Sequence, residues 1–371
     1  MQEFLLTSNV QLGASYGVSE VASARITEAQ RGVATLVNAT DDEIIMGPST
    51  TALLRTLAAS LGQTLSPGDE IVVTNGDHEA NIGPWVDLER FGAVVRFWEV
   101  DSASGELHTE DLVRLLGPRT RLVAVTHASN ILGSINPIRA IADIVHAHGA
   151  WICVDGVGYA PHRAVDVRAL DVDFYVFSFY KTFGPHHAVL FGRHEHLLEL
   201  PGQSFYFVSE ADVPSKFQPG NVNYELSYGT LGLMDYLGRL AADPSHVGSA
   251  VTRASVEGAF DRIAEHEEGL SARLLDFLAT KPRARVIGSL RADSAVRVPI
   301  VSFVVEGVSS ADIVKKIDEH QIGIRYGDFY SARLIEALGL PDDDGVVRVS
   351  MVHYNTLDEV DRLTDFLDRL I

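Results

Sequence analysis

Residues 151–156, WICVDG, and residues 174–181, FYVFSFYK, share a pattern that decides how this chain folds. Each is a short and almost continuously apolar run that ends at a polar or ionisable side chain. Runs of this length and composition predict β-strands buried on both faces, as in a parallel sheet covered by helices. The two ionisable residues, Asp155 and Lys181, then stand just after the carboxyl ends of two strands.

Further apolar runs extend this sheet along the first two thirds of the chain. They are residues 71–75, 94–100, 121–127 and 188–192. Helical stretches are expected between them, for example over residues 109–116 and 138–147. Strands that alternate with helices in this way predict an α/β fold with a mostly parallel sheet.

The pattern changes after Gly220, where long helices are expected over residues 224–241 and 255–279. Strand-like runs follow, with a helix over residues 310–320 among them. These runs are residues 284–289, 300–307, 323–327 and 346–352. Thr356 with Glu359 three residues later forms a capping-box signature, which predicts a last helix that runs to the C-terminus.

These two patterns predict two domains of unequal size. A large domain covers residues 1–245 and a smaller C-terminal α+β domain covers residues 246–371, with the boundary at Asp243-Pro244. A chain of 371 residues of which 46% are hydrophobic has enough apolar material for two cores.

Composition also excludes several functions. The net charge of −20 argues against binding to nucleic acid or to anionic membranes through a general electrostatic field. The single cysteine, Cys153, rules out a disulfide within the chain and favours a reducing compartment. The N-terminus lacks a signal-peptide pattern, and no run approaches the roughly 18 apolar residues of a membrane span. We therefore expect a cytoplasmic protein.

The residues that follow the predicted strands supply a coherent chemistry. A lysine and a carboxylate at neighbouring strand ends, here Lys181 and Asp155, are what pyridoxal 5′-phosphate (PLP) requires for its Schiff base and its pyridine nitrogen. The segment 47–51, GPSTT, places hydroxyl groups at the start of a helix, where a phosphate is well bound. We therefore expect PLP as the cofactor.

Taken in order, the motifs resemble those of a known family. They are GPSTT (47–51), DHEANIGPW (77–85), THASNILGSINPI (126–138), ICVDG (152–156), FSFYKTFGP (177–185), PGN (219–221) and RVSMVHYNT (348–356). This order resembles the class V aminotransferase superfamily of PLP fold type I, and most closely its cysteine desulfurase-like branch. The resemblance runs from about Asn9 to the C-terminus.

The resemblance implies roles for the residues around the cofactor ring. Lys181 would form the Schiff base and then shuttle protons as the general base. Asp155 would pair with the pyridine nitrogen, and His78 would stack on the ring. Asn130 would lie near the phenolic oxygen of the cofactor.

The resemblance also implies how phosphate and substrate are held. Ser49, Thr50 and Ser178 would bind the phosphate, and Arg348 would form a bidentate pair with the α-carboxylate of the substrate. The family acts as a homodimer in which the partner reaches into the phosphate site. The matching position here is Asn221.

The chain departs from the family pattern at four places. Desulfurases carry a nucleophilic cysteine on a loop that corresponds to residues 323–330, which contain none, and Cys153 is expected in the core. A persulfide mechanism is therefore not expected. Tyr180 and Gly158 replace the usual His and Gln beside the cofactor. The usual N-terminal LD-x-A-A stretch has no counterpart, so we expect an open or differently lined pocket.

Two rival motifs point to other chemistries. Residues 13–17 fit the G-x-S-x-G nucleophile elbow, but too few residues precede Ser15 to build the strands of a hydrolase. Four histidines flank one predicted strand, a spacing that does not fix a common direction for a metal. They are His186, His187, His194 and His196.

Three functions remain open from the sequence. The first is a carbon–sulfur β-lyase that acts on an amino acid or a cysteine S-conjugate. The second is another PLP reaction, namely a decarboxylating deaminase, an aminotransferase or an epimerase. The third is a PLP-fold module that only binds. Retention of Lys181, Asp155 and Arg348 together argues against the third.

Overall fold

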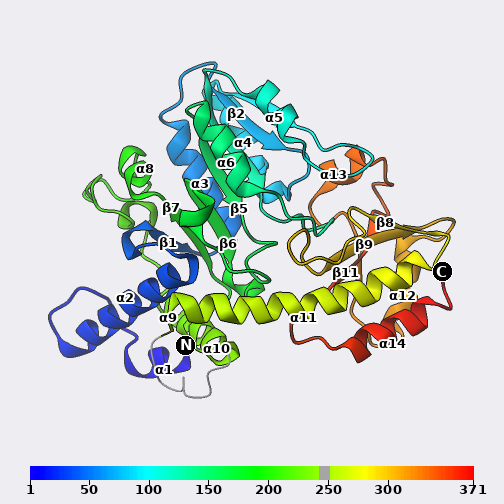
Figure 1. Ribbon diagram of the computed structural model, residues 1–371. Helices are drawn as coiled ribbons and strands as arrows, with labels where there is room; N and C mark the ends of the chain where they lie inside the picture. The colour runs from blue at the N-terminus through cyan, green and yellow to red at the C-terminus, as the bar shows by residue number, and fades with distance from the viewer. Residues whose placement is uncertain (242–250) are drawn as a thin grey trace.

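The computed structural model describes residues 1–241 and 251–371 and contains two sheets (Figure 1). The larger sheet has seven strands in the order β1-β7-β6-β5-β4-β2-β3. Their bounds are β1 Ile44–Gly47, β2 Glu70–Thr74, β3 Val94–Trp98, β4 Thr120–Thr126, β5 Trp151–Asp155, β6 Phe174–Ser178 and β7 Ala188–Gly192. The strands from β3 to β6 are parallel, while β7 runs antiparallel to both β6 and β1. The predicted α/β fold with a mostly parallel sheet is confirmed.

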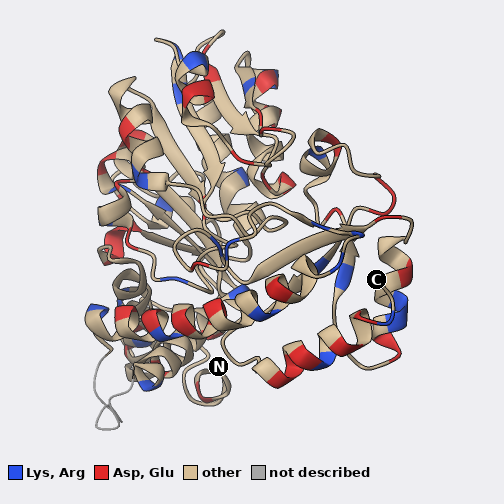
Figure 2. Cartoon of the chain, turned by 45° about the vertical axis from the view of Figure 1, so that its right-hand side comes forward, with Lys and Arg blue, Asp and Glu red and all other residues tan. Residues whose placement is uncertain are grey.

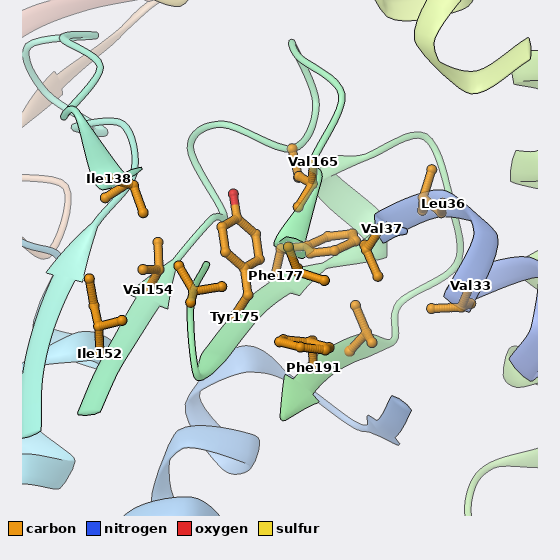
Figure 3. Packing of buried hydrophobic residues seen from close by; sticks show 14 of the residues in the cluster. Val33, Leu36, Val37, Ile138, Ile152, Val154, Val165, Tyr175, Phe177 and Phe191 are labelled. Atoms are coloured by element: carbon orange, nitrogen blue, oxygen red, sulfur yellow. The ribbon is translucent and has the colours of Figure 1, made fainter. Parts of the chain in front are cut away.

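Helices of this part of the chain pack on both faces of the sheet or on neighbouring helices. They are α1 Gln2–Thr7, α2 Gly17–Val37, α3 Thr50–Gly62, α4 Gly83–Val86, α5 Thr109–Leu115, α6 Ile138–Ala147, α7 Val167–Leu170, α8 His194–Glu199, α9 Tyr224–Gly229 and α10 Leu231–Leu240. Because side chains alternate along a strand, Ile152 and Val154 of β5 enter one core and Cys153 enters the other. Figure 3 shows Val33 and Val37 of α2 close to Phe177 and Phe191 in the first core.

The smaller sheet has four antiparallel strands in the order β10-β11-β9-β8. Their bounds are β8 Ala284–Ile287, β9 Ile300–Val305, β10 Arg325–Gly327 and β11 Val346–Ser350. The helices of this part are α12 Ser310–Asp318, α13 Ala332–Ala337 and α14 Leu357–Leu367. Thr356 and Glu359 form the predicted capping box at the start of α14.

Helix α11, Arg253–Ala279, connects the two sheets (Figure 1). Its first half contributes Val256 and Ile263 to the core of the large sheet, and its second half contributes Leu270 and Leu274 to the core of the small one. The predicted domain boundary at residue 245 lies outside the described residues. Acidic and basic residues both mark the outer surface of α11 and α14 in Figure 2, with no continuous basic stretch on either helix.

Local structure differs from expectation in two regions. The helix expected over residues 224–241 is split into α9 and α10 at Thr230. Hydroxyl groups turn back onto the chain there: Thr230 Oγ1 donates to Ser227 O (2.7 Å) and Ser227 Oγ donates to Asn223 O (2.6 Å), which favours a break. Helix α2 and strand β1 are present although no pattern predicted them. None of the described helices combines the length and apolar character that crossing a membrane requires.

The two sheets are joined by hydrogen bonds around Gly133. The N–H of Val298 donates to Gly133 O (2.8 Å), and the Arg297 guanidinium donates to Ile300 O (2.6 Å) and Leu132 O (3.3 Å). Gly133 has a φ of +71°, and a Cβ placed on it would lie 2.3 Å from Ile300 O. Only glycine permits this close approach between the segment after β4 and the start of β9.

This geometry predicts that Gly133→Ala is far more destabilising than Gly149→Ala. Gly149 has a similar φ of +74° but nothing within 4 Å of an added Cβ. Urea unfolding should therefore show a loss of about 1 kcal/mol for Gly149→Ala and about 3 kcal/mol or more for Gly133→Ala. Equal losses in the free energy of unfolding would mean that the close approach of Ile300 O to Gly133 does not determine the cost of the substitution.

Candidate active site

A cavity of about 380 Å³ lies where the carboxyl ends of β4, β5 and β6 face the small sheet. Among the residues that line it are all but one of those predicted to act on cofactor or substrate. They are Ser49, Thr50, His78, Asn130, Asp155, Ser178, Lys181 and Arg348. Ser49 is the first residue along the described chain to line the cavity.

One end of the cavity is built for an anion. Ser49 is the N-cap of α3, and its hydroxyl accepts a hydrogen bond from Ala52 N (3.1 Å). The buried Thr50 Oγ1 and Ser178 Oγ lie 2.7 Å apart, so β6 delivers its last hydroxyl to the first turn of α3. Free N–H groups and the positive end of the helix dipole favour a phosphate at this position.

The charged centre of the cavity is formed by Asp155 and Lys181. Asp155 is buried at the end of β5 and accepts a hydrogen bond from Val157 N (2.8 Å). Burial raises the pKa of Asp155, while Val157 N and the charge of Lys181 oppose this shift. Lys181 is exposed because its side chain opens into the cavity. The cavity walls still desolvate its amine and lower the pKa of Lys181, with Arg348 adding to the effect and Asp155 opposing it.

His78 is held as a neutral ring at the mouth of the same centre. Its Nδ1 accepts a hydrogen bond from Ala80 N (3.0 Å). Burial, and then the charges of Lys181 and Arg348, lower the pKa of His78 to about 4. A neutral imidazole can stack on an aromatic ring without carrying a charge into the site.

Arg348 lies on β11 and reaches the cavity from the small sheet. Its Nη1 donates to Asn130 O (2.8 Å), whereas its Nε is buried and has no hydrogen-bond partner among the described residues. Burial, and then the charge of Arg325, lower the pKa of Arg348 to about 10, so it is still a cation at neutral pH. A buried cationic donor without an acceptor suits a carboxylate ligand.

Asn221 does not line the cavity. It is exposed on the loop before α9 and has a φ of +69°. A role for Asn221 in the site of a partner subunit stays a prediction.

The departures from the family pattern have visible consequences. Tyr180 stacks on His186, with ring centroids 4.4 Å apart, and also lines the cavity, where the Lys181 Nζ lies 5.8 Å from the centroid of its ring. A Cβ on Gly158 would lie 2.5 Å from Ala128 O, so this backbone path leaves no room for a side chain at that position. Cys153 is fully buried, and burial raises its pKa well above the usual value, so it is not poised as a thiolate.

The rival motifs do not form sites. Ser15 lies on an exposed loop ahead of α2 and follows no strand. The histidines face different partners: His187 contacts Ser227 (3.2 Å), and His196 contacts Asp173 (3.0 Å). Within residues 1–241 and 251–371, no three His, Cys, Asp or Glu side chains are arranged to hold a metal ion.

One buried charge cluster beside the cavity had no signal in the sequence. His162 lines the cavity, and its Nδ1 lies 2.9 Å from Glu267 Oε1 on α11. Arg163 Nη1 donates to Glu267 Oε2 (3.0 Å). The partners are about a hundred residues apart in the chain, so no local spacing could have indicated them.

The buried side chain of His127 makes the free energy of unfolding depend on pH. Its ring is buried, stacks on Tyr159 with centroids 3.5 Å apart and lies 2.8 Å from Tyr175 Oη. Burial lowers the pKa of His127 from 6.5 to about 3. The folded state therefore keeps this ring neutral at a pH where the unfolded chain already takes up a proton.

We predict that the free energy of unfolding falls as pH drops below about 6.5 and that His127→Phe reduces this dependence. The slope between pH 6 and pH 5 should be smaller in the variant by up to about 1.4 kcal/mol per pH unit. Urea unfolding of the wild type and of His127→Phe at several pH values measures this slope. Identical slopes would contradict a buried neutral His127.

Comparison with known proteins agrees with this geometry. A family model described as class-V aminotransferase matches residues 1–363. An aminotransferase-like protein of Gibberella zeae is 43% identical, with 100% of this chain aligned to 89% of that protein. A cysteine desulfurase-like protein of Aspergillus flavus is 38% identical, and 91% of this chain aligns to 76% of it. A nonribosomal peptide synthetase-like enzyme of Aspergillus fumigatus is 37% identical, and 97% of this chain aligns to 24% of that enzyme.

Solved structures show the same fold. The apo cysteine desulfurase of Thermococcus onnurineus superposes with a TM-score of 0.87 at 26% identity, over 100% of this chain and 90% of that one. The Escherichia coli cysteine desulfurase CsdA gives a TM-score of 0.81 at 28% identity, over 99% of this chain and 89% of that one.

Proposed function

This chain belongs to the class-V aminotransferase family, whose members depend on PLP, and on that premise we propose that it is a PLP-dependent carbon–sulfur β-lyase. Its substrate would be an amino acid whose β-carbon carries sulfur, such as cysteine or a cysteine S-conjugate. The observation that carries this proposal is one cavity that combines Lys181, Asp155 and Arg348 but contains no cysteine.

The residues present fit the cofactor. The Ser49, Thr50 and Ser178 hydroxyls would hold its phosphate at the start of α3. Asp155, buried and bonded only to backbone among its described hydrogen bonds, would pair with the ring nitrogen. When bound, PLP supplies an electron sink that makes the α-proton of an amino acid removable.

The chain's own side chains would then carry out binding and proton transfer. Arg348 would bind the α-carboxylate through its free Nε edge. The Lys181 Nζ, whose pKa is lowered by the cavity walls, would take the proton from the substrate α-carbon. Loss of the sulfur substituent from the β-carbon, followed by hydrolysis, would yield a thiol, pyruvate and ammonia.

One observation supports a sulfur-containing substrate, and a second supports cleavage without an enzyme-bound persulfide. Several relatives are named cysteine desulfurases, which points to sulfur substrates. Cys153, however, is fully buried in the core and does not line the cavity. The sulfur would therefore leave as a free thiol or sulfide.

The product balance tests this proposal. The PLP-loaded protein is incubated with L-cysteine and with S-benzyl-L-cysteine, and pyruvate, thiol and carbon dioxide are followed together. We expect pyruvate in amounts equal to the hydrogen sulfide released from L-cysteine or to the benzyl thiol released from S-benzyl-L-cysteine, without carbon dioxide. Carbon dioxide without thiol would replace the β-lyase by a decarboxylating reaction.

Lys181→Ala should abolish the visible absorbance of the lysine-bound cofactor and lower turnover by about a thousandfold or more. The fold should be retained, because the side chain is exposed and opens into the cavity, where it supports no packing of the core. Lys315→Ala, which removes an exposed lysine of α12, is the matched control and should keep both properties. Near-normal turnover in Lys181→Ala would refute the mechanism, and a colourless wild-type protein would favour a module that only binds.

Cys153→Ala should leave turnover within about threefold of the wild type, since the thiol takes no part in the reaction. Initial rates of pyruvate formation check this. A loss on the order of a hundredfold in a variant with normal cofactor absorbance would restore a persulfide route.

A further inference from the structure

The loop Asp328–Ser331, here called the latch loop, joins β10 to α13 and is bound to the cavity residue Asn130. Asn130 Nδ2 donates to Phe329 O (3.0 Å), and Ser331 Oγ donates to Asn130 Oδ1 (2.9 Å). Both polar atoms of the amide are therefore engaged by the latch loop. The two segments lie about 200 residues apart in the chain.

A second set of contacts fixes the same loop to the residue after His78. Glu79 N donates to Tyr330 O (2.8 Å), and Arg333 Nε lies 3.2 Å from Glu79 Oε2. The rings of His78 and Tyr330 have centroids 5.4 Å apart. The latch loop is thus tied to two points of the large sheet.

The backbone of the latch loop shows that these contacts determine its shape. Phe329 and Tyr330 have φ values of +53° and +61°. Two consecutive non-glycine residues in the left-handed region are unfavourable on their own. Such a conformation persists where the surroundings impose it, and here the bonds to Asn130 and Glu79 do so.

The latch loop places an aromatic ring on Arg348. The guanidinium carbon of Arg348 lies 3.7 Å from the centroid of the Phe329 ring. Its Nη1 donates to Asn130 O (2.8 Å), and its buried Nε has no partner among the described residues. One face and one amine of the guanidinium are therefore occupied, which leaves the Nε edge as the donor for a ligand.

We propose that Phe329 and Asn130 are positioning residues that shape Arg348 into a receptor for the carboxylate of the substrate. This inference rests on the proposed function, because it concerns the same cavity. Phe329 keeps water off one face of the guanidinium and prevents its rotation, and Asn130 holds both Phe329 and Arg348 Nη1 in place. A ligand with a carboxylate gains from this arrangement, and an equally reactive ligand without one does not.

A pair of aminooxy compounds measures this difference whatever the natural substrate is. Aminooxyacetate carries a carboxylate and methoxyamine does not, and both react with lysine-bound PLP with a change in absorbance. The rate ratio of aminooxyacetate to methoxyamine, measured on the PLP-loaded protein, reports recognition of the carboxylate. Phe329→Leu should lower this ratio roughly tenfold, the size of one weakened charge-assisted contact. The methoxyamine rate should stay unchanged.

Two further variants sharpen the test. Phe329→Tyr keeps the ring over Arg348 and should keep the ratio. Phe91→Leu is the matched control, because Phe91 is also partly exposed with an arginine, Arg90, at 5.0 Å from its ring, but it lies away from the cavity. An unchanged ratio in Phe329→Leu would overturn the proposal, as would equal losses of both rates, since these would make Phe329 merely structural.

The role of Asn130 has a test that needs no cofactor. In the apoprotein, Asn130→Ala should speed hydrogen exchange of the amides of residues 328–331 by roughly tenfold, because two of the bonds that hold the loop are lost. Unchanged hydrogen exchange would overturn the proposal that Asn130 holds the latch loop in place. If the wild-type protein fails to react with either aminooxy compound, the proposed function fails, while the exchange experiment still decides on the latch.

Discussion

The cavity exists only where the two sheets meet, so the site depends on the hydrogen bonds that hold β9 against the segment after β4. Val298 N donates to Gly133 O, and Ser302 Oγ donates to Ile131 O (2.5 Å). Lys181 and Asp155 belong to the large sheet and Arg348 to the small one. A shift of this joint would therefore change the distance between the groups that would hold cofactor and those that would hold substrate.

The cavity is a small cationic site in a chain of net charge −20. Its charged lining residues are Lys181, Arg348 and Asp155, two cations to one carboxylate. Exposed charges are screened by water, whereas those in a desolvated cavity interact strongly. The excess positive charge, together with the start of α3, therefore favours anionic ligands. A phosphate and a carboxylate would neutralise it from opposite ends.

How much of the fold and of the candidate site could be predicted from the sequence depends on how far apart in the chain the interacting residues lie. Asp155 and Lys181 were identified from sequence because strand ends gather at one edge of a parallel sheet, a local rule that needs no partner. The pairing of Asn130 with the latch loop and of His162 with Glu267 was missed, since these side chains meet across one to two hundred residues of chain. The break at Thr230 arose from hydroxyl groups that compete with helical hydrogen bonds, which an apolar periodicity does not register. Asn221 concerns a second subunit, so one chain leaves it a prediction.

The latch loop also bears on the chemistry. In the cysteine desulfurases that the chain resembles, the corresponding loop carries a nucleophilic cysteine, whereas here it brings Phe329 to Arg348. A loop that shapes a carboxylate receptor gains from being fixed, and three hydrogen bonds to Asn130 and Glu79 fix this one, with the ion pair between Arg333 of α13 and Glu79 beside it. Under the proposed function, the same stretch of backbone would serve binding in place of nucleophilic attack, which fits a substrate whose leaving group departs unaided by the protein.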